Sequence, residues 1–494
     1  MEPSASAGTT PDPDDALLLR SVRRLVDRLA ALPPERGDQP TPLGQHLSGV
    51  LGTDVRTLPV VSEEFAPHRL ADVDIALTAL AGDGPGSLLG VSGGSARQGI
   101  GFAELLTAPY AGADVGPVDY ATRATGPDSE RQVVAFGIRC LTVDGVPLAV
   151  LQRMPRPDYG QPLVVLEVLA ADPAVCGTFL ARLRALMLEH SVLRGQVLSF
   201  TATEYGSEAG ATFLRRPHVP AEEIVLPDGV LEQVVGHVVG IGEHRDTLLA
   251  AGQHLKRGIL LHGPPGTGKT LTVRHLLGAT PGTTAILLTG SSLHLIGAAA
   301  EVARTFQPSV VVLEDVDLVA MDRDFGDGPQ PVLFEVLDAL DGLDGDADVA
   351  FVLTTNRVAV LERALAERPG RVDLAVEIPL PDDDARRRLF RRYAGEQPFS
   401  AAALDAAAAR AEGTTGSFPK ELVRRAVLAA AVRGEEVTDS DLSQALDGLL
   451  SAREALTLRL LGHADGGERP WPGGPPDAGD LPGDPGAELP PESC

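Results

Sequence analysis

Gly263-Pro264-Pro265-Gly266-Thr267-Gly268-Lys269-Thr270 is the stretch that decides the fold of this chain. An apolar run, Gly258-Ile259-Leu260-Leu261, precedes it, and a helical pattern begins at Leu271. A strand, a glycine-rich turn and a helix start, in this order, are typical of a loop that binds phosphate. The glycines let backbone N–H groups turn inward around the phosphate, and the dipole of the helix N-terminus adds to the attraction. We therefore predict a nucleotide site here.

Side chains of this stretch have separate expected roles. Lys269 would place a positive charge on the outer phosphates, and the Thr270 hydroxyl would ligate Mg²⁺. Two prolines stiffen the turn. The residues predicted to hold a nucleoside triphosphate are Gly263, Pro264, Pro265, Gly266, Thr267, Gly268, Lys269, Thr270 and Leu271.

The segments after this loop alternate between strand and helix patterns. Strands are predicted at Thr284–Thr289, Val310–Glu314 and Val349–Thr354, with helices between them. Such alternation is typical of a parallel, doubly wound sheet, which binds ligands at the carboxyl ends of its strands. From Asp382 the strand signal vanishes and four helical stretches follow. The sequence therefore predicts an α/β fold with a C-terminal helical lid domain.

Polar residues follow two of these predicted strands. The run Val310–Leu313 ends in Glu314-Asp315, which would direct one carboxylate toward Mg²⁺ and the other toward an attacking water. Asn356 follows the next strand, where its amide would orient that water or contact the γ-phosphate; a plain turn residue is an equal alternative. Arg368 and Arg371 flank a glycine turn, and a planar guanidinium suits developing phosphoryl charge, although arginines in loops are usually solvated.

Composition limits the classes of partner and the compartment. The formal net charge of -26 argues against a general nucleic-acid binder, although a local basic channel stays open. Cys140, Cys176 and Cys494 are widely spaced without a CxxC pattern, which favours free thiols in a reducing cytosol over a disulfide framework or a zinc site. No run reaches the roughly 20 apolar residues of a membrane span. A cytoplasmic protein without a membrane span is predicted.

The 494 residues divide into five predicted segments. Residues 1–13 and the acidic, Pro- and Gly-rich residues 463–494 are expected to be disordered. Residues 14–216 form an α+β N-terminal domain, which begins with a helix capped by Asp14 or Asp15 and contains a hairpin around Asp144-Gly145. Residues 221–382 form the nucleotide-binding domain and residues 383–462 the lid. The N-terminal domain shows no catalytic spacing.

Taken together, Gly263–Thr270, Leu313–Leu318, Thr354–Arg357 and Arg368–Asp373 resemble the AAA family of P-loop ATPases in order and spacing, over about residues 221–450. The overall pattern is similar to the valosin-containing and proteasomal-regulatory branch, and the Leu-Glu-Asp-Val-Asp order resembles the mitochondrial Rieske-protein translocase subgroup. The resemblance implies ATP and Mg²⁺ as ligands. It implies that Thr270 and Glu314 bind the metal. It also implies that the catalytic residues of this chain are Asp315, Asn356, Arg368 and Arg371.

The same resemblance implies a homo-oligomer, usually a hexameric ring, in which Arg368 and Arg371 act on a neighbouring subunit's nucleotide. A protein client would contact the N-terminal domain and the Leu295/Ile296 loop, and the alternative for Leu295 is an ordinary core residue. Three features depart from the family pattern: the Glu314-Asp315 order, Leu295 in place of an aromatic, and Thr415–Phe418 where many relatives have Gly-Ala-Asp. An ATP-driven remodeller of proteins is the first hypothesis. A nucleotide-switched scaffold with slow turnover and a nucleic-acid motor are the alternatives.

Overall fold

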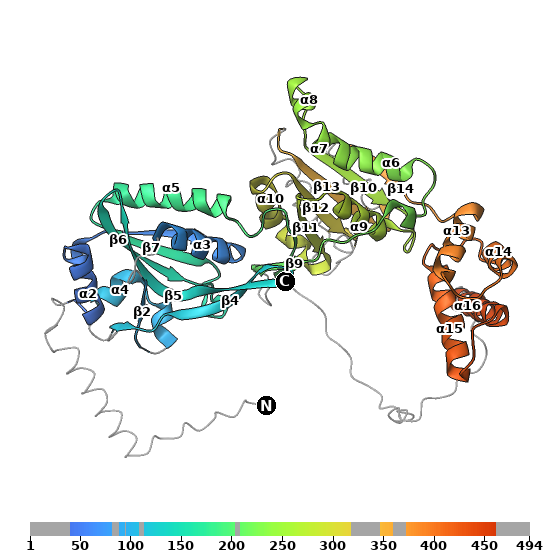
Figure 1. Cartoon of the computed structure of the whole chain (residues 1–494), viewed down its shortest axis with the longest axis horizontal. Coiled ribbons are helices and arrows are strands. Elements are labelled where there is room, and N and C mark those ends of the chain that lie inside the picture. Colours follow the sequence, from blue (N-terminus) through green and yellow to red (C-terminus); the bar gives the residue numbers. More distant parts are fainter. Residues whose placement is uncertain are drawn as a thin grey trace, which may run out of the picture. The chain divides into compact units, whose positions relative to one another are not determined.

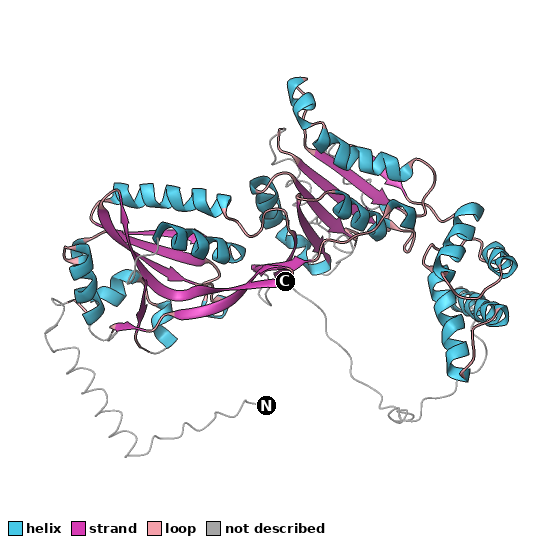
Figure 2. Ribbon diagram, in the orientation of Figure 1, coloured by secondary structure: helices cyan, strands magenta, loops and turns pink. Residues whose placement is uncertain are grey.

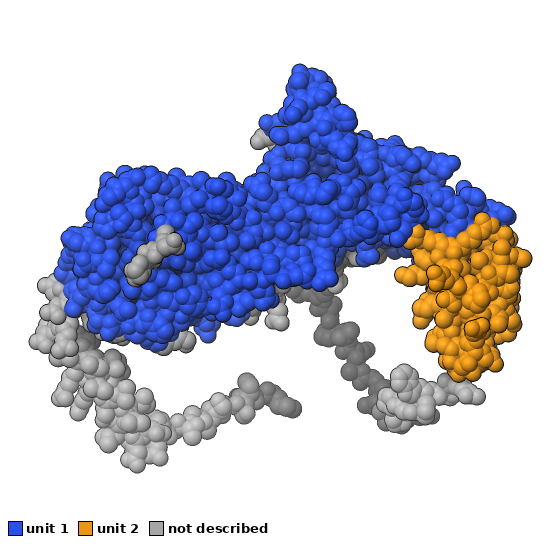
Figure 3. Space-filling model, in the orientation of Figure 1, with its two compact units in different colours: residues 1–389, 411–418 blue, residues 390–410, 419–494 orange. Residues whose placement is uncertain are grey.

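The computed structural model describes residues 40–81, 88–93, 95–107, 113–202, 208–317, 346–358 and 372–460. The predicted helix that begins near Asp14, residues 1–13 and 463–494, and Arg368 and Arg371 lie outside the described residues. The chain divides into two compact units, which Figure 3 colours separately. One comprises residues 1–389 and 411–418, and the other comprises residues 390–410 and 419–494.

The N-terminal half of the first unit is an antiparallel sheet with helices on both faces (Figures 1 and 2). Its strand order is β1-β7-β6-β5-β2-β3, and β4 pairs with β5. The strands are β1 (Val60–Phe65), β2 (Leu88–Val91), β3 (Val115–Gly116), β4 (Asp119–Gly126), β5 (Ser129–Val143), β6 (Val146–Arg153) and β7 (Val164–Ala170). The helices are α2 (Pro42–Leu51), α3 (Leu70–Ala81), α4 (Phe102–Thr107) and α5 (Pro173–Glu189). Short 3-10 helices are η1 (Val55–Thr57), η2 (Pro67–Arg69), η3 (Ser95–Gly99) and η4 (Pro157–Tyr159).

The predicted hairpin around Asp144-Gly145 is confirmed. Val143 pairs with Val146, and both turn residues have positive φ angles, 50° and 83°. Two left-handed residues match the right-handed twist of the strands they join. Along β6, alternate residues belong to two different cores: Leu148 and Val150 pack with α3 and α5, while Ala149 and Leu151 pack with α2 and α4.

The second sheet carries the nucleotide-binding motifs, and its order is β14-β10-β13-β12-β11-β8-β9. Its strands are β8 (Val197–Ala202), β9 (Glu208–Leu214), β10 (Arg257–His262), β11 (Thr284–Thr289), β12 (Ser309–Glu314), β13 (Val349–Thr355) and β14 (Leu374–Glu377). The strands from β14 to β8 pair in parallel, as predicted for a doubly wound sheet. β10, β13 and β12 are neighbours, so the segments that follow them meet at one edge.

The pairing differs from the predicted domain boundary at residue 216 in one respect. β8 and β9 precede that boundary, yet β8 pairs in parallel with β11 and β9 pairs antiparallel to β8. These strands extend the second sheet rather than the N-terminal sheet. The link that joins α5 to β8 contains Val192, which contacts the cores of both sheets. The other predicted domain limits stay predictions.

Helices cover both faces of the second sheet, because the central residues of its buried strands are apolar on both sides. Ile259 and Leu261 pack with α6 (Val230–Val235) and α9 (Lys269–Ala279), whereas Leu260 packs with α10 (Ile296–Thr305). The predicted helix over 231–249 is interrupted near its glycines: a π-helical turn, η6 (Gly236–Gly240), is followed by α7 (Ile241–Glu243) and α8 (Arg245–Ala250). Two 3-10 helices are η5 (Ala221–Glu223) and η7 (Gly290–Leu295).

The C-terminal region is helical, as predicted. It consists of α13 (Asp383–Ala394), α14 (Ala401–Arg410), α15 (Phe418–Arg433) and α16 (Asp439–Leu460). Asp441 accepts hydrogen bonds from the backbone N–H and the hydroxyl of Thr438, at 2.9 and 2.8 Å, so the predicted cap of the last helix is present. Among the described residues, no helix combines the length and the apolar character that a membrane span requires.

Replacing Arg257 with alanine should lower the free energy of unfolding of the second sheet by about 3–5 kcal/mol. Its Nη1 donates to Asp348 Oδ1 at 2.8 Å, its Nε donates to the Val238 carbonyl at 2.9 Å, and both charged side chains are buried. The substitution leaves the Asp348 carboxylate buried without its cation. Urea unfolding of the purified chain measures the change. Arg215→Ala is the control. It removes an ion pair with Asp128 in which the Arg215 side chain is 79% exposed, so the urea midpoint should stay unchanged.

Candidate nucleotide site

The phosphate-binding loop connects β10 to α9 and takes its shape from three glycines with positive φ. Gly263, Gly266 and Gly268 have φ angles of 142°, 74° and 118°. A Cβ at Gly263 would lie 2.2 Å from the carbonyl oxygen of Ile378, and one at Gly266 would lie 2.6 Å from the Ser417 hydroxyl. The contact at Gly263 is with rigid backbone that only glycine fits, and the positive φ angles disfavour a side chain at all three positions. The loop is therefore built for a bare backbone, whose N–H groups are the usual ligands of phosphate.

Lys269 lies at the first position of α9 and is buried. Its Nζ donates to the carbonyl oxygens of Gly263 and Pro264 at 2.7 and 2.8 Å. Burial lowers the pKa of this ammonium, while the Asp315 and Asp317 carboxylates act in the opposite direction. The ammonium thus lies within the concave side of the loop and within the field of the acids that follow β12.

Glu314 ends β12, and its carboxylate accepts a hydrogen bond from the Thr270 hydroxyl. Burial raises the pKa of Glu314, and Asp315 raises it further; Thr270 and Arg274 lower it. A hydroxyl beside a carboxylate is the oxygen pair that a protein-bound Mg²⁺ takes together with phosphate oxygens. The residues present therefore fit Mg²⁺ carried by a nucleotide.

Asp315 and Asn356, predicted from separate strand ends, lie in contact. The Asn356 side-chain amide donates to Asp315 Oδ1 at 3.1 Å. Asp317, which is buried, accepts hydrogen bonds from the Thr355 hydroxyl at 2.9 Å and from the Asn356 backbone N–H at 3.1 Å. These bonds fix the side chain of Asn356 toward Asp315.

A further segment contacts the phosphate loop from the C-terminal side. The backbone N–H of Ser417 donates to the carbonyl of Gly266 at 3.1 Å, and the Thr415 hydroxyl lies 3.2 Å from the Cβ position of Gly266. This segment is the one whose sequence departs from the Gly-Ala-Asp pattern of many relatives. The sequence marks this segment by its departure from the family pattern. It does not indicate that the backbone of Ser417 contacts the loop.

The predicted client loop is contradicted by burial. Leu295 is 8% exposed and Ile296 is 1% exposed, and both belong to the core beneath α10. Their side chains pack against the sheet, so they do not present an apolar grip to a client. Burial supports the alternative that Leu295 is a core residue, because η7 turns its side chain inward. Arg368 and Arg371, the predicted fingers, lie outside the described residues.

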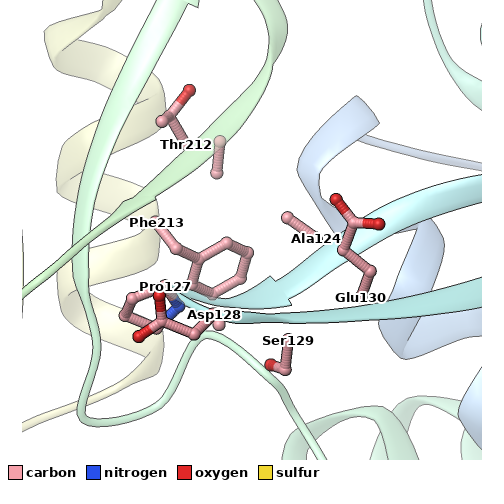
Figure 4. Close-up of a pocket in the computed structure, with 9 residues that line it drawn as sticks. Ala124, Pro127, Asp128, Ser129, Glu130, Thr212 and Phe213 are labelled. Carbon is pink, nitrogen blue, oxygen red and sulfur yellow. The ribbon is translucent and has the colours of Figure 1, made fainter.

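A groove of about 510 Å³ lies between the β4–β5 hairpin and β9, away from the phosphate loop (Figure 4). Asp128 and Glu130 are the titratable residues in the described lining, and Arg215 pairs with Asp128 at 2.6 Å. Two carboxylates disfavour a phosphate ligand. The geometry therefore favours the loop after β10 over this groove as the candidate nucleotide site.

Comparison with known proteins agrees with this assignment. The family model described as "ATPase family associated with various cellular activities (AAA)" matches residues 259–380. The chain is 31% identical over 306 residues to the ATP-dependent zinc metalloprotease FtsH 2 of Sphaerobacter thermophilus, covering 57% of this chain and 46% of the relative.

Two other relatives match similar lengths. FtsH 3 of the same organism is 31% identical over 287 residues, covering 52% of this chain and 58% of the relative. The proteasome-activating nucleotidase of Thermococcus onnurineus is 29% identical over 273 residues, covering 52% and 68%. The chain spans about half the length of the FtsH relatives. Residues 259–380 of this chain thus form an ATPase domain of the AAA family.

Proposed function

We propose that this chain binds ATP with Mg²⁺ and hydrolyses it to ADP and phosphate. The observation that carries the proposal is the hydrogen bond of 3.1 Å from the Asn356 amide to Asp315 Oδ1, at the edge of the sheet where the loop buries Lys269. The Thr270 hydroxyl beside Glu314 adds support, because phosphoryl transfer requires a metal-binding pair close to the groups that direct water.

The side chains divide the work in this proposal. Backbone N–H groups of the loop and the Lys269 ammonium hold the β- and γ-phosphates. Thr270 and Glu314 would hold Mg²⁺, which neutralises charge on the phosphates when it is bound. Asp315 accepts a proton from the attacking water, and Asn356 orients that water or the γ-phosphate. The catalytic power of such a site comes mainly from position and charge.

We further propose that the chain works as a ring of identical subunits that remodels protein clients. AAA proteins usually form hexameric rings, and two of the relatives are named for ATP-dependent proteolysis and proteasome activation. The N-terminal sheet would contact the client, since its sequence has no catalytic spacing. Val192, which packs into both cores, gives a physical route by which the two sheets influence one another.

Lys269→Met should reduce ATP affinity at least about tenfold, because the buried ammonium is the cation that lies inside the loop. Binding of a fluorescent ATP analogue in the presence of Mg²⁺ measures the loss, and phosphate release should disappear with it. Lys256→Met is the matched control, because Lys256 precedes the amino end of β10 and the loop follows the carboxyl end. Equal affinity in Lys269→Met and the unaltered chain would contradict the proposal.

The burial of Leu295 and Ile296 favours a second candidate, a nucleotide-switched scaffold with slow ATP turnover. A remodeller that pulls on clients should hydrolyse ATP faster when a client is present. The rate of phosphate release is therefore measured with and without a reduced, carboxymethylated protein. Stimulation supports remodelling, and a rate indifferent to the unfolded protein supports the scaffold.

A further inference from the structure

Asp315 has an unusual backbone conformation for its residue type. Its φ angle is +51°, and among the described residues the only other non-glycine with positive φ is Asp144, which lies in a hairpin turn. Outside such a turn, a left-handed non-glycine residue persists only when its surroundings hold it there. The side chain of aspartate is one methylene shorter than that of glutamate. The direction of the Asp315 side chain therefore decides whether its carboxylate approaches the phosphates.

Thr354 bonds to the backbone at and after Asp315. Its hydroxyl accepts the backbone N–H of Asp315 at 3.0 Å, and its carbonyl accepts the N–H of Val316 at 3.1 Å. Thr354 lies near the end of β13 and is 1% exposed, so its position is fixed by the sheet. Two consecutive amides after β12 are thereby attached to one residue of the neighbouring strand, 39 residues away in the chain.

We infer that Thr354 is a positioning residue for ATP hydrolysis: its hydroxyl holds Asp315 in the left-handed conformation that aims a short carboxylate at the reacting water. The inference rests on the proposed function. In the observed conformation, Asp315 Oδ1 lies 3.1 Å from the Asn356 amide, so the turned backbone brings the carboxylate to the residue that orients water. The carboxylate of an aspartate is about one methylene closer to the backbone than that of a glutamate. The left-handed backbone of Asp315 compensates by turning the shorter side chain toward Asn356.

The first test separates positioning from folding. Thr354→Val keeps the shape of the side chain and removes the acceptor, so kcat should fall by about 10- to 100-fold, because misplacement by about 1 Å costs that much. The Kd for a fluorescent ATP analogue should stay unchanged. Thr354→Ser retains the hydroxyl and should retain kcat. A Thr354→Val enzyme with full kcat, or a Thr354→Ser enzyme as slow as Thr354→Val, overturns the inference.

Thr284→Val is the matched control. Thr284 is buried in the same sheet and its hydroxyl bonds to the Phe306 carbonyl at 2.8 Å, but it begins β11 at the amino end of the strand. It should lose thermal stability to a similar degree as Thr354→Val and keep kcat. If both variants lose kcat in proportion to their loss of Tm, Thr354 acts only through stability and the inference fails.

The second test examines the backbone without any activity measurement. Alanine is usually more stabilising than glycine, but a left-handed residue reverses this order. Asp315→Gly should therefore have a higher Tm than Asp315→Ala, and the difference should shrink when Thr354→Val is added. A higher Tm for Asp315→Ala overturns the inference. If the unaltered chain does not bind ATP, the proposed function is contradicted. The comparison of Tm values would still test the backbone conformation of Asp315.

Discussion

Asp315→Asn should lower ATP turnover by about 10²–10⁴-fold, the usual contribution of a positioned general base. Asparagine has the same shape, tolerates the left-handed backbone at this position and can still accept the hydrogen bond from Asn356. What it lacks is a carboxylate that accepts a proton. ATP affinity should therefore stay the same while phosphate release slows by that factor, and the variant should retain ATP on the protein for longer.

Glu314→Gln distinguishes the two neighbouring acids. Because Glu314 contacts the Thr270 hydroxyl, its loss should weaken Mg²⁺ binding, and added Mg²⁺ should restore part of the rate. Added Mg²⁺ should do nothing for Asp315→Asn. If Asp315→Asn retains turnover and Glu314→Gln stays inactive at every Mg²⁺ concentration, the roles of the two acids are reversed and the usual Asp-Glu order of the family does not predict them here.

Much of the ATP site was predictable from the sequence because its elements are local. A buried parallel strand is a continuous apolar run, so β10, β12 and β13 and the polar residues after them stand out. Neighbouring parallel strands bring their carboxyl ends together. The contact between Asn356 and Asp315, 41 residues apart, follows from that geometry and from no other signal.

The features that were missed depend on partners distant in sequence. β8 pairs with β11, in which Ala285 lies opposite Val197, and the run Val197–Ala202 gives no indication of which sheet it joins. Thr354 interacts through a hydroxyl and a backbone amide, so its role depends on a φ angle that no residue pattern encodes. An apolar residue such as Leu295 fits both a core position and an exposed client-binding loop. Only its packing under α10 distinguishes the two.

Arg368→Ala should lower kcat by about 10³–10⁵-fold and spare ATP affinity, if Arg368 acts as an arginine finger. A guanidinium from a neighbouring subunit stabilises the charge that develops on the transferred phosphoryl group, but it contributes little before the reaction begins. Steady-state phosphate release and binding of an ATP analogue measure the two quantities separately. A proportional loss of both would mean that the variant disturbs the site itself.

Mixing two inactive variants tests whether the finger comes from another subunit. An Arg368→Ala subunit retains Asp315, and an Asp315→Asn subunit retains Arg368, so their mixture contains sites with both groups intact. Activity should therefore reappear on mixing. Arg368→Ala mixed with the Arg368→Ala/Asp315→Asn double variant has no intact finger and should stay inactive. If co-purification of differently tagged subunits shows mixed assemblies and the first mixture is still inactive, then each site is complete within one subunit and the ring is not needed for hydrolysis.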